Sequence, residues 1–279
     1  MRVSVAGATG RQGGSVVDAL LAADRSFDVR GVTRDATTRE ARTLRDRGVE
    51  LIEGNMADRA AMDRAVAEAD AVFGVTVGGG DAQREQGRTL VAAAAAGDPD
   101  RFVFSSGGNA DRRPGIPEVD AKHDVERRLA ATDLETTVIR PHSFTTNFTG
   151  QRRAIENGEI AVPMPEGASQ LLVDPADVGR FAARAIVEPA RFVGKTVELA
   201  AESLTLAGIA AAFTDVLNRP VEPTRIPLDE VEETTARFVR FLADCTADID
   251  RLREEFDFRP RSLRESLRER GWAPSHRRV

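Results

Sequence analysis

Four side chains of this sequence could move a proton or polarise a carbonyl group. Lys122 and His142 could each donate a proton, and the hydroxyls of Ser105 and Ser106 could each donate a hydrogen bond to a substrate oxygen. Lys122 is the first candidate, because it and Lys195 are the only lysines among 39 lysines and arginines. His142 is the weaker candidate, because only its position recommends it. The alternative is that none of these residues is catalytic: Lys122 would lie on a helix surface, and the two serines would only end a strand. Neither serine has an evident base beside it.

Residue types that bind metals are too few and too scattered to predict a metal site. The three histidines and Cys245 form no cluster with carboxylates at metal-ligand spacing. His123 follows Lys122 but faces another side of the helix, and His276 lies in a basic tail. We therefore expect no metal. A single cysteine also excludes an internal disulfide, and we interpret Cys245 as a buried, inert thiol.

A glycine-rich turn near the N-terminus predicts dinucleotide binding. It reads Gly7-Ala-Thr-Gly-Arg-Gln-Gly-Gly14, directly after a predicted strand and directly before an amphipathic helix. Glycines in this context permit a tight turn and let the backbone approach a pyrophosphate, which then meets N–H groups at the helix N-terminus. The spacing is GxxGxxG rather than GxGxxG, and an ordinary tight connection is the alternative. The expected cofactor contacts are Gly7, Thr9, Gly10, Arg11, Gln12 and Gly13.

The end of the second predicted strand favours NADP(H) over NAD(H). An acidic residue there would bind the ribose hydroxyls of NAD, whereas an arginine accommodates the 2′-phosphate of NADP. The strand ends at Thr33 and is followed by Arg34, with Arg39 as a candidate second cation at the start of the next helix. Because an arginine can bind a phosphate in a bidentate manner, we predict NADP(H). Asp35 is the counter-argument, since it could pair with Arg34 or bind the ribose itself.

Two later strand ends supply further candidate contacts to the cofactor. Asn55 and Met56 follow the third predicted strand, where an adenine ring would lie, although Met56 could equally fill the core. Thr76 and Val77 end the fourth strand at the carboxyl edge of the sheet, where the cofactor's ribose passes. The triple glycine that follows, residues 78–80, receives no chemical role.

Strands and helices alternate through the first half of the chain. Short apolar runs predict the strands, and between them apolar residues recur at the three- and four-residue spacing of an amphipathic helix. This alternation indicates βαβ units and an α/β fold with a doubly wound parallel sheet of the Rossmann type, covered by helices on both faces. The predicted strands are Val3–Ala6, Val29–Thr33, Val49–Ile52, Ala71–Val77, Phe102–Ser105 and Thr136–Ile139.

The pattern loosens after Pro141, which predicts a smaller C-terminal α/β domain. We assign residues 1–150 to the NADP-binding domain and residues 151–279 to a substrate or effector domain, with the segment around 170–200 returning to the first. Asp174 as cap and Pro175 in the first turn predict a helix that ends at Val187. The other expected elements are a helix near 148–157, strands at 171–173, 196–199 and 221–226, a helix at 206–217, and charged helices up to Trp272.

Composition and charge exclude several classes of protein. No apolar run reaches the roughly 20 residues that cross a bilayer, and the first strand leaves no room for a signal peptide, so we expect a cytoplasmic protein without membrane association. The net charge of −6 and the pI of about 5.3 predict no broad basic surface and no direct nucleic-acid binding. The expected partners are a dinucleotide and either a small-molecule substrate or a protein.

Several of these motifs together resemble the NmrA-like family of atypical short-chain dehydrogenases/reductases. The resemblance extends over most of the chain. It rests on the glycine-rich turn, Val32-Thr-Arg34, Phe102-Val-Phe-Ser-Ser106, Lys122 with Val125-Glu126, Ile139-Arg-Pro-His-Ser-Phe-Thr-Thr-Asn-Phe148 and Val173-Asp-Pro-Ala-Asp-Val-Gly179. It implies an NADP-binding Rossmann domain with a smaller C-terminal domain. Some relatives are reductases, and others are redox sensors or transcription co-regulators.

The resemblance also bears on the catalytic residues. Ordinary members of the wider superfamily use a tyrosine four residues before a lysine, but the residue four before Lys122 is Glu118, and the chain contains no tyrosine. Lys122 could still bind the nicotinamide ribose and transfer a proton, as the similarity to isoflavone-reductase-like relatives implies. The contacts expected around the nicotinamide are Ser105, Ser106, Lys122, Pro141, Phe144 and Asn147.

Two functions of different classes fit these residues. We predict a redox-responsive, NADP(H)-binding regulatory or sensor protein, because the missing tyrosine favours it. The alternative is an NADPH-dependent reductase of a small carbonyl or enone-like substrate that uses Lys122. The Lys122→Ala variant distinguishes them, since it should abolish turnover in the reductase but weaken only cofactor affinity in the sensor. An epimerase or dehydratase with tightly held NAD is a third, weaker reading, because Arg34 indicates NADP.

Overall fold

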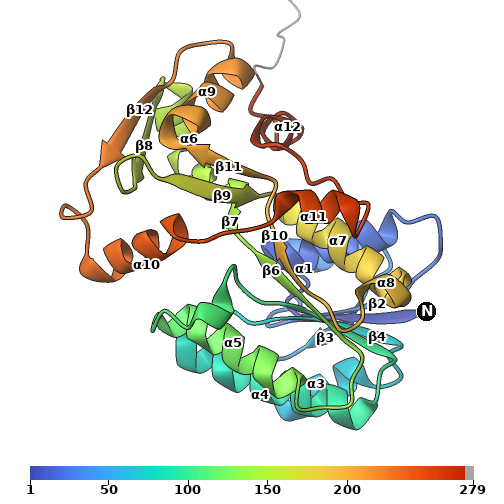
Figure 1. Cartoon of the computed structure of the whole chain (residues 1–279). Coiled ribbons are helices and arrows are strands. Elements are labelled where there is room, and N and C mark those ends of the chain that lie inside the picture. Colours follow the sequence, from blue (N-terminus) through green and yellow to red (C-terminus); the bar gives the residue numbers. More distant parts are fainter. Residues whose placement is uncertain (274–279) are drawn as a thin grey trace, which may run out of the picture. The chain divides into compact units, whose positions relative to one another are not determined.

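Strands and helices alternate from the N-terminus of the computed structural model, which describes residues 1–273 (Figure 1). All six strands predicted for the first half are present. β4 ends at Val75 rather than at the predicted Val77, because side chains take the backbone hydrogen bonds of the next residues. The elements are β1 (Arg2–Val5), α1 (Arg11–Leu21), β2 (Asp28–Thr33), α2 (Arg39–Asp46), β3 (Glu50–Glu53), α3 (Arg59–Val66), β4 (Ala71–Val75), α4 (Gly80–Gly97), β5 (Arg101–Ser105), α5 (Pro117–Leu129) and β6 (Thr136–Pro141).

Seven strands form one sheet in the order β10-β6-β5-β4-β1-β2-β3, where β10 is Thr196–Leu199. Neighbours from β6 to β3 pair in parallel, so that Val3 lies opposite Val29 on one side and Ala71 on the other. The chain runs outward from β1 to β3 and then crosses back to β4 on the other side of β1. The strand order therefore reverses between β1 and β4, and the predicted doubly wound parallel sheet is confirmed.

Helices cover both faces of this sheet. α3, α4 and α5 lie on one face, and α1 and α7 (Pro175–Val187) lie on the other (Figure 1). Two glycines allow close helix packing. A Cβ atom on Gly179 of α7 would lie 2.1 Å from the backbone oxygen of Ser15 in α1, and one on Gly87 of α4 would lie 2.1 Å from Cγ2 of Val125 in α5. Any larger residue at these positions would push the paired helices apart.

The described chain divides into two compact units. The first unit consists of residues 1–140 and 175–197, and the second consists of residues 141–174 and the chain from Glu198 onward. The short helix α8 (Pro189–Phe192) belongs to the first unit. The second unit contains a three-stranded sheet in the order β11-β9-β7 and a parallel pair, β12 and β8. Its elements are β7 (Ser143–Phe144), a 3₁₀ helix (Thr145–Gln151), α6 (Arg152–Glu156), β8 (Glu159–Pro163), β9 (Ser169–Val173), β11 (Glu202–Thr205), α9 (Leu206–Leu217), β12 (Glu222–Ile226), α10 (Glu233–Ala243), α11 (Ile249–Glu254) and α12 (Leu263–Glu269).

Sequence patterns predict the second unit less completely than the first. α7 and α9 begin and end at the predicted residues. The helix predicted near 148–157 is instead a 3₁₀ helix followed by the five-residue α6, because Gly150 and the threonines before it favour other backbone conformations. Strands β7, β8 and β11 are not among the predicted elements.

Each unit has its own hydrophobic core. Phe102 and Phe104 of β5 pack with apolar residues of α3, α4 and α5 in the first unit. In the second unit, the ring of Phe213 lies edge to face against Phe148 and Trp272, with centroids 5.5 and 5.0 Å apart.

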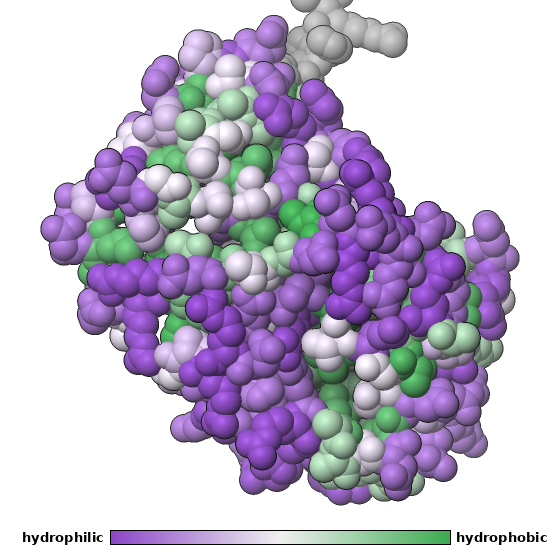
Figure 2. All heavy atoms as spheres, in the orientation of Figure 1, coloured by the Kyte–Doolittle hydropathy of each residue, from purple (hydrophilic) through white to green (hydrophobic). Residues whose placement is uncertain are grey.

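Hydrophilic residues dominate the face of the molecule shown in Figure 2. Among residues 1–273, the large hydrophobic side chains that are exposed are those of Val77 and Phe238. Cys245 is half-buried in the turn after α10, so the prediction of a buried thiol is wrong. No helix in the described part of the chain has the length and apolar character that would let it cross a membrane.

Candidate functional site

The candidate site lies along the carboxyl ends of the parallel strands in the first unit. The glycine-rich turn follows β1, and the residues after β2, β3, β4 and β5 leave the sheet at the same edge. Ligands of doubly wound sheets bind at this edge, next to the point where the strand order reverses. The fold therefore brings the cofactor candidates of the first unit to one edge.

The glycine-rich turn is too tight for side chains at two positions. Gly7 has a φ of +65°, a left-handed conformation that favours glycine, and its carbonyl accepts a hydrogen bond from the Gly10 N–H at 2.8 Å. A Cβ atom on Gly13 would lie 2.3 Å from the Gly7 oxygen. Helix α1 begins at Arg11, and Gly10 at its N-cap supplies no side-chain cap. This arrangement is the cradle that a pyrophosphate needs at a helix N-terminus.

The end of β2 places an arginine beside this turn. The hydroxyls of Thr33 and Thr9 are 3.3 Å apart, which ties the two chain segments together. Arg34 is exposed, and none of residues 1–273 forms a side-chain hydrogen bond or ion pair with it. Asp35 instead accepts hydrogen bonds from the hydroxyl and N–H of Thr37, at 2.6 and 2.7 Å, and these bonds lower the pKa of its carboxyl group. Asp35 is therefore engaged locally, and the Arg34 guanidinium stays available for an anion.

A groove of about 280 Å³ opens between α1 and α2 next to the turn. Thr9 and Asp18 line one side, and Arg39 and Glu40 line the other. Asp18 is neutralised by Arg47 at 2.6 Å. Arg39, the second predicted cation, thus faces a groove that begins at the glycine-rich turn.

The residues after β3 differ in their exposure. Asn55 is exposed, and its side-chain oxygen accepts a hydrogen bond from the N–H of Ala57 at 3.0 Å. Met56 is 6% exposed and packs in the core with Met62 of α3 and Phe104 of β5. The structure therefore places Met56 in the core and leaves Asn55 at the sheet edge.

Lys122 of α5 reaches the loop after β4. Its ammonium donates a hydrogen bond to the carbonyl oxygen of Thr76, with 3.1 Å between Nζ and O. Desolvation lowers the pKa of Lys122 to about 8, although the negative charge of Glu126 acts in the opposite direction. At neutral pH the ammonium would be protonated and close to its pKa, which suits a proton donor.

The two serines at the end of β5 have different partners. Ser105 is fully buried, and its hydroxyl donates a hydrogen bond to the side-chain oxygen of Gln12 at 2.5 Å, which links β5 to the glycine-rich turn. Ser106 is 2% exposed and lies beside Glu126, but its Oγ makes no well-aligned hydrogen bond. Neither hydroxyl is hydrogen-bonded to a histidine or lysine of the described residues that could activate it as a nucleophile.

A buried charge network, which the sequence did not reveal, lies next to Ser106. Arg140 of β6 donates to both oxygens of Glu126 in α5, at 3.0 and 2.7 Å, and also pairs with Asp111 at 2.8 Å. His123 lies 3.1 Å from Glu126. Burial is the largest single effect on the pKa of Glu126 and would raise it, but the hydrogen bonds and charge of Arg140, together with smaller contributions from Ser106 and His123, lower it overall. The network fixes α5, and therefore Lys122, against β6.

The remaining predicted residues belong to the second unit. Pro141 ends β6, Phe144 is half-buried in β7, and Asn147 is exposed in the 3₁₀ helix. Nε2 of His142 lies 3.0 Å from a carboxylate oxygen of Glu198, and the histidine side chain is 1% exposed. His276 lies outside the described residues. No group of three or more histidines, cysteines and carboxylates within residues 1–273 could hold a metal ion.

A profile described as the NmrA-like family matches residues 1–248. The chain belongs to the NmrA-like family. The resemblance drawn from the motifs is therefore confirmed. One relative, an NmrA-like family domain-containing oxidoreductase of Aspergillus japonicus, is 32% identical over 179 residues. The match covers 59% of this chain and 54% of that protein, so the chain spans about half the length of this relative.

Two solved structures share the fold of this NmrA-like protein. The NADPH-dependent quinone oxidoreductase of Escherichia coli, complexed with NADPH, is 22% identical with a TM-score of 0.79, covering 96% of this chain and 99% of that one. NmrA, a negative transcriptional regulator in complex with NADP, is 20% identical with a TM-score of 0.78, covering 96% and 94%. Another structure of NmrA holds NAD. The same fold thus occurs in a reductase and in a regulator.

Proposed function

We propose that this NmrA-like protein binds NADP(H) in its first unit and reduces a small carbonyl or enone-like substrate. The observation that carries the proposal is Lys122, whose pKa is lowered to about 8 at the carboxyl edge of the sheet. The glycine-rich turn would hold the pyrophosphate, and Arg34 and Arg39 would hold the 2′-phosphate. The second unit would take the substrate or effector.

A bound nicotinamide would supply a hydride to the substrate carbon. Lys122 would donate a proton to the substrate oxygen, so that the carbonyl becomes an alcohol, and the neutral amine would regain its proton from water. Its hydrogen bond to Thr76 holds the ammonium in place during this transfer. His142 is a weaker second candidate, because its ring is enclosed beside Glu198.

A regulatory function is the second candidate, and one observation favours it. The chain has no tyrosine to act as the usual acid of the wider superfamily, and neither hydroxyl of the two serines at the end of β5 is hydrogen-bonded to a base. A regulator would bind NADP+ and NADPH with different affinities and couple that difference to a partner surface.

Calorimetric titration with NADPH, NADP+, NADH and NAD+ tests the cofactor. Replacing Arg34 by alanine should weaken binding of NADP+ and NADPH by about 10- to 100-fold, and leave NAD+ and NADH nearly unchanged, because a charge-assisted phosphate contact is lost. Arg88→Ala, an exposed arginine of α4, is the control with the same change in net charge. The proposal fails if the unmutated protein binds no dinucleotide.

Oxidation of NADPH with quinone and enone acceptors tests the reaction. Lys122→Met should abolish turnover in a reductase, and the titrations above show whether it still binds the cofactor. In a regulator, no acceptor supports turnover, and the same variant changes only cofactor affinity.

A further inference from the structure

Side chains form hydrogen bonds with four backbone polar groups in the loop between β4 and α4. Gln86 accepts a hydrogen bond from the N–H of Val77 at 2.9 Å and donates one to the carbonyl of the same residue at 3.0 Å. Gln83 donates to the carbonyl of Gly78 at 2.8 Å. With the bond from Lys122 to Thr76, three side chains from two helices hold residues 76–78.

Both glutamines lie on the buried face of α4. Gln83 is 4% exposed and Gln86 is 9% exposed, on the same face as Leu90. An amide on a core-facing helix position costs free energy unless all of its hydrogen bonds are made. A leucine would suit that face better for stability alone. The presence of Gln83 and Gln86 on this face is therefore best explained by their hydrogen bonds to the loop between β4 and α4.

The side-chain amide of Gln86 binds the backbone of Val77 with the two hydrogen bonds that a neighbouring strand would otherwise supply. Its amide satisfies both the N–H and the C=O of that residue, although β4 has already ended at Val75. The backbone of Val77 is thereby fixed, and its side chain is 45% exposed. Fixing an apolar side chain in water gives no stability, so its orientation suits contact with a ligand.

Gln83 also belongs to a chain of hydrogen bonds that reaches Lys122 through Thr76. Because its nitrogen donates to Gly78, its oxygen accepts from the Thr76 hydroxyl at 3.1 Å. Because the Thr76 hydroxyl donates its hydrogen to Gln83, its oxygen can only accept a further hydrogen bond. The donor is Nζ of Lys122, which lies 3.5 Å away. The direction of each hydrogen bond follows from the one before it.

We propose that Gln86 is a positioning residue for the dinucleotide, which acts by presenting the side chain of Val77 to it. Gln83 supports the same loop from the next turn of α4. The inference rests on the proposed function, because it requires a dinucleotide at the carboxyl edge of the sheet.

Affinity for NADP+ in a double-mutant cycle tests this inference. Gln86→Met should weaken binding about tenfold, and Val77→Ala should weaken it several-fold. The variant with both changes should bind NADP+ about as weakly as Gln86→Met alone, because the loss of Gln86 already removes the contact between Val77 and the dinucleotide. Additive losses, or unchanged binding by Gln86→Met, would overturn the inference. Arg88→Ala is the control on the same helix.

A third variant separates positioning from a general loss of structure. In Gln86→Glu, a protonated carboxyl can both accept from and donate to Val77, whereas a carboxylate cannot donate. Its affinity for NADP+, relative to that of the unmutated protein, should therefore recover as the pH falls from 8 to 5.5. A constant ratio across this range would contradict the inference. Failure of the unmutated protein to bind NADP+ would instead overturn the proposed function, and the inference with it.

Discussion

The ammonium of Lys122 is hydrogen-bonded to the carbonyl oxygen of Thr76, at 3.1 Å, rather than to a carboxylate. No residue of the described chain forms an ion pair with Nζ. A lysine bound to a neutral acceptor can lose its proton without leaving a buried carboxylate unpaired. Lys122 therefore combines a fixed position with a pKa near the physiological range.

The pKa of Lys122 predicts a rise in stability at alkaline pH. Its pKa is lowered from 10.5 to about 8 in the fold, so the unfolded chain binds more protons between these two values. The free-energy cost of the desolvated ammonium is present in full below pH 8 and is relieved as the pH approaches 10.5. We expect the free energy of unfolding to rise by about 1 to 3 kcal/mol over this range.

Urea unfolding between pH 7.5 and 10.5 measures this effect. The chain has no tyrosine, one cysteine and two lysines, so few other groups titrate in this window. Lys122→Met should be more stable than the unmutated protein at pH 7.5 and should lose the rise. The exposed Lys195→Met is the matched control and should keep it. An unchanged slope in Lys122→Met would contradict the assignment.

Gly13→Ala should damage the glycine-rich turn. The added Cβ would lie 2.3 Å from the carbonyl oxygen of Gly7, a distance that only a shift of the backbone can relieve. We expect a loss of about 2 to 3 kcal/mol in the free energy of unfolding and no measurable dinucleotide binding. Gly14→Ala, whose Cβ would lie 3.3 Å from the Ala8 oxygen, should be much milder. Equal effects of the two changes would argue against this reading of the turn.

Removing one partner of the buried Arg140–Glu126 pair should lower the free energy of unfolding strongly, whereas replacing both partners by apolar residues should lower it much less. Glu126→Gln leaves the Arg140 guanidinium without its main counter-charge in a site where both side chains are about 10% exposed. We expect a loss of about 3 to 5 kcal/mol, much of which the apolar double variant Glu126→Leu with Arg140→Met should restore. Urea unfolding measures both. Asp63→Asn, which breaks the exposed pair with Arg59, should cost under about 1 kcal/mol.

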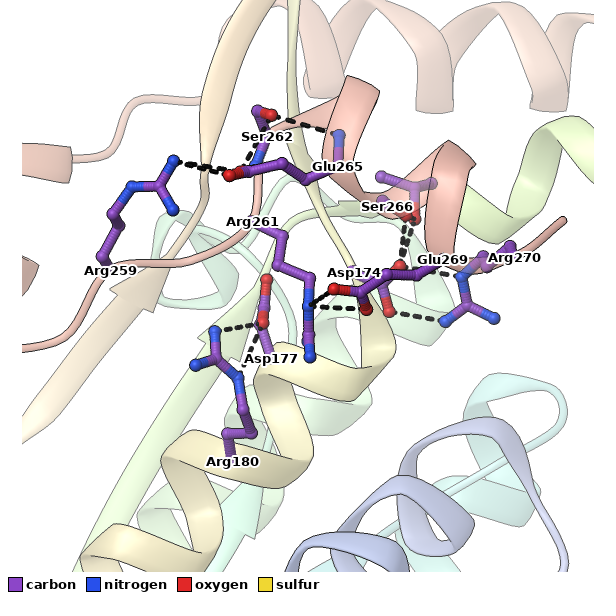
Figure 3. Close-up of polar contacts among 11 residues, drawn as sticks. Asp174, Asp177, Arg180, Arg259, Arg261, Ser262, Glu265, Ser266, Glu269 and Arg270 are labelled. Carbon is purple, nitrogen blue, oxygen red and sulfur yellow. Dashed lines mark hydrogen bonds and ion pairs between the residues drawn. The ribbon is translucent and has the colours of Figure 1, made fainter. Parts of the chain in front are cut away.

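Asp174 should hold α12 in the second unit. Its carboxylate, 2% exposed, accepts hydrogen bonds from Ser266 and Arg270 (Figure 3) and a further one from Thr145. Asp174→Asn should therefore cost about 3 kcal/mol in the free energy of unfolding, because a buried ion pair is lost. Asp215→Asn removes a half-exposed partner of Arg264 on the same helix and should cost under about 1 kcal/mol.

Trp272 gives a local readout for this prediction. It is the only tryptophan of the chain, it is 4% exposed, and it packs on Phe213 shortly after α12 ends. Release of α12 should shift its fluorescence to longer wavelength before the protein unfolds globally. If Asp174→Asn and Asp215→Asn behave alike, Asp174 does not hold this helix.

The sequence by itself determined the parallel sheet, the glycine-rich turn, the position of an arginine directly after β2, and the bounds of α7 and α9. Each of these depends on a local pattern of a few residues: an apolar run, helical spacing, a capping residue or a glycine. The resemblance to relatives, together with the rarity of lysine in the chain, suggested Lys122 as a proton donor.

Only the tertiary structure decided which side chains meet. The short strands of the second unit form by pairing of distant segments, as when Glu202 of β11 lies opposite Leu172 of β9, so no local period marks them. Asp174 reads as a helix cap in sequence, but it also meets Arg270, which is 96 residues later. Gln83 and Gln86 were visible only as two polar residues on the apolar face of a helix. Their role depends on where β4 ends, and that is set by contacts between elements rather than by neighbours in the chain.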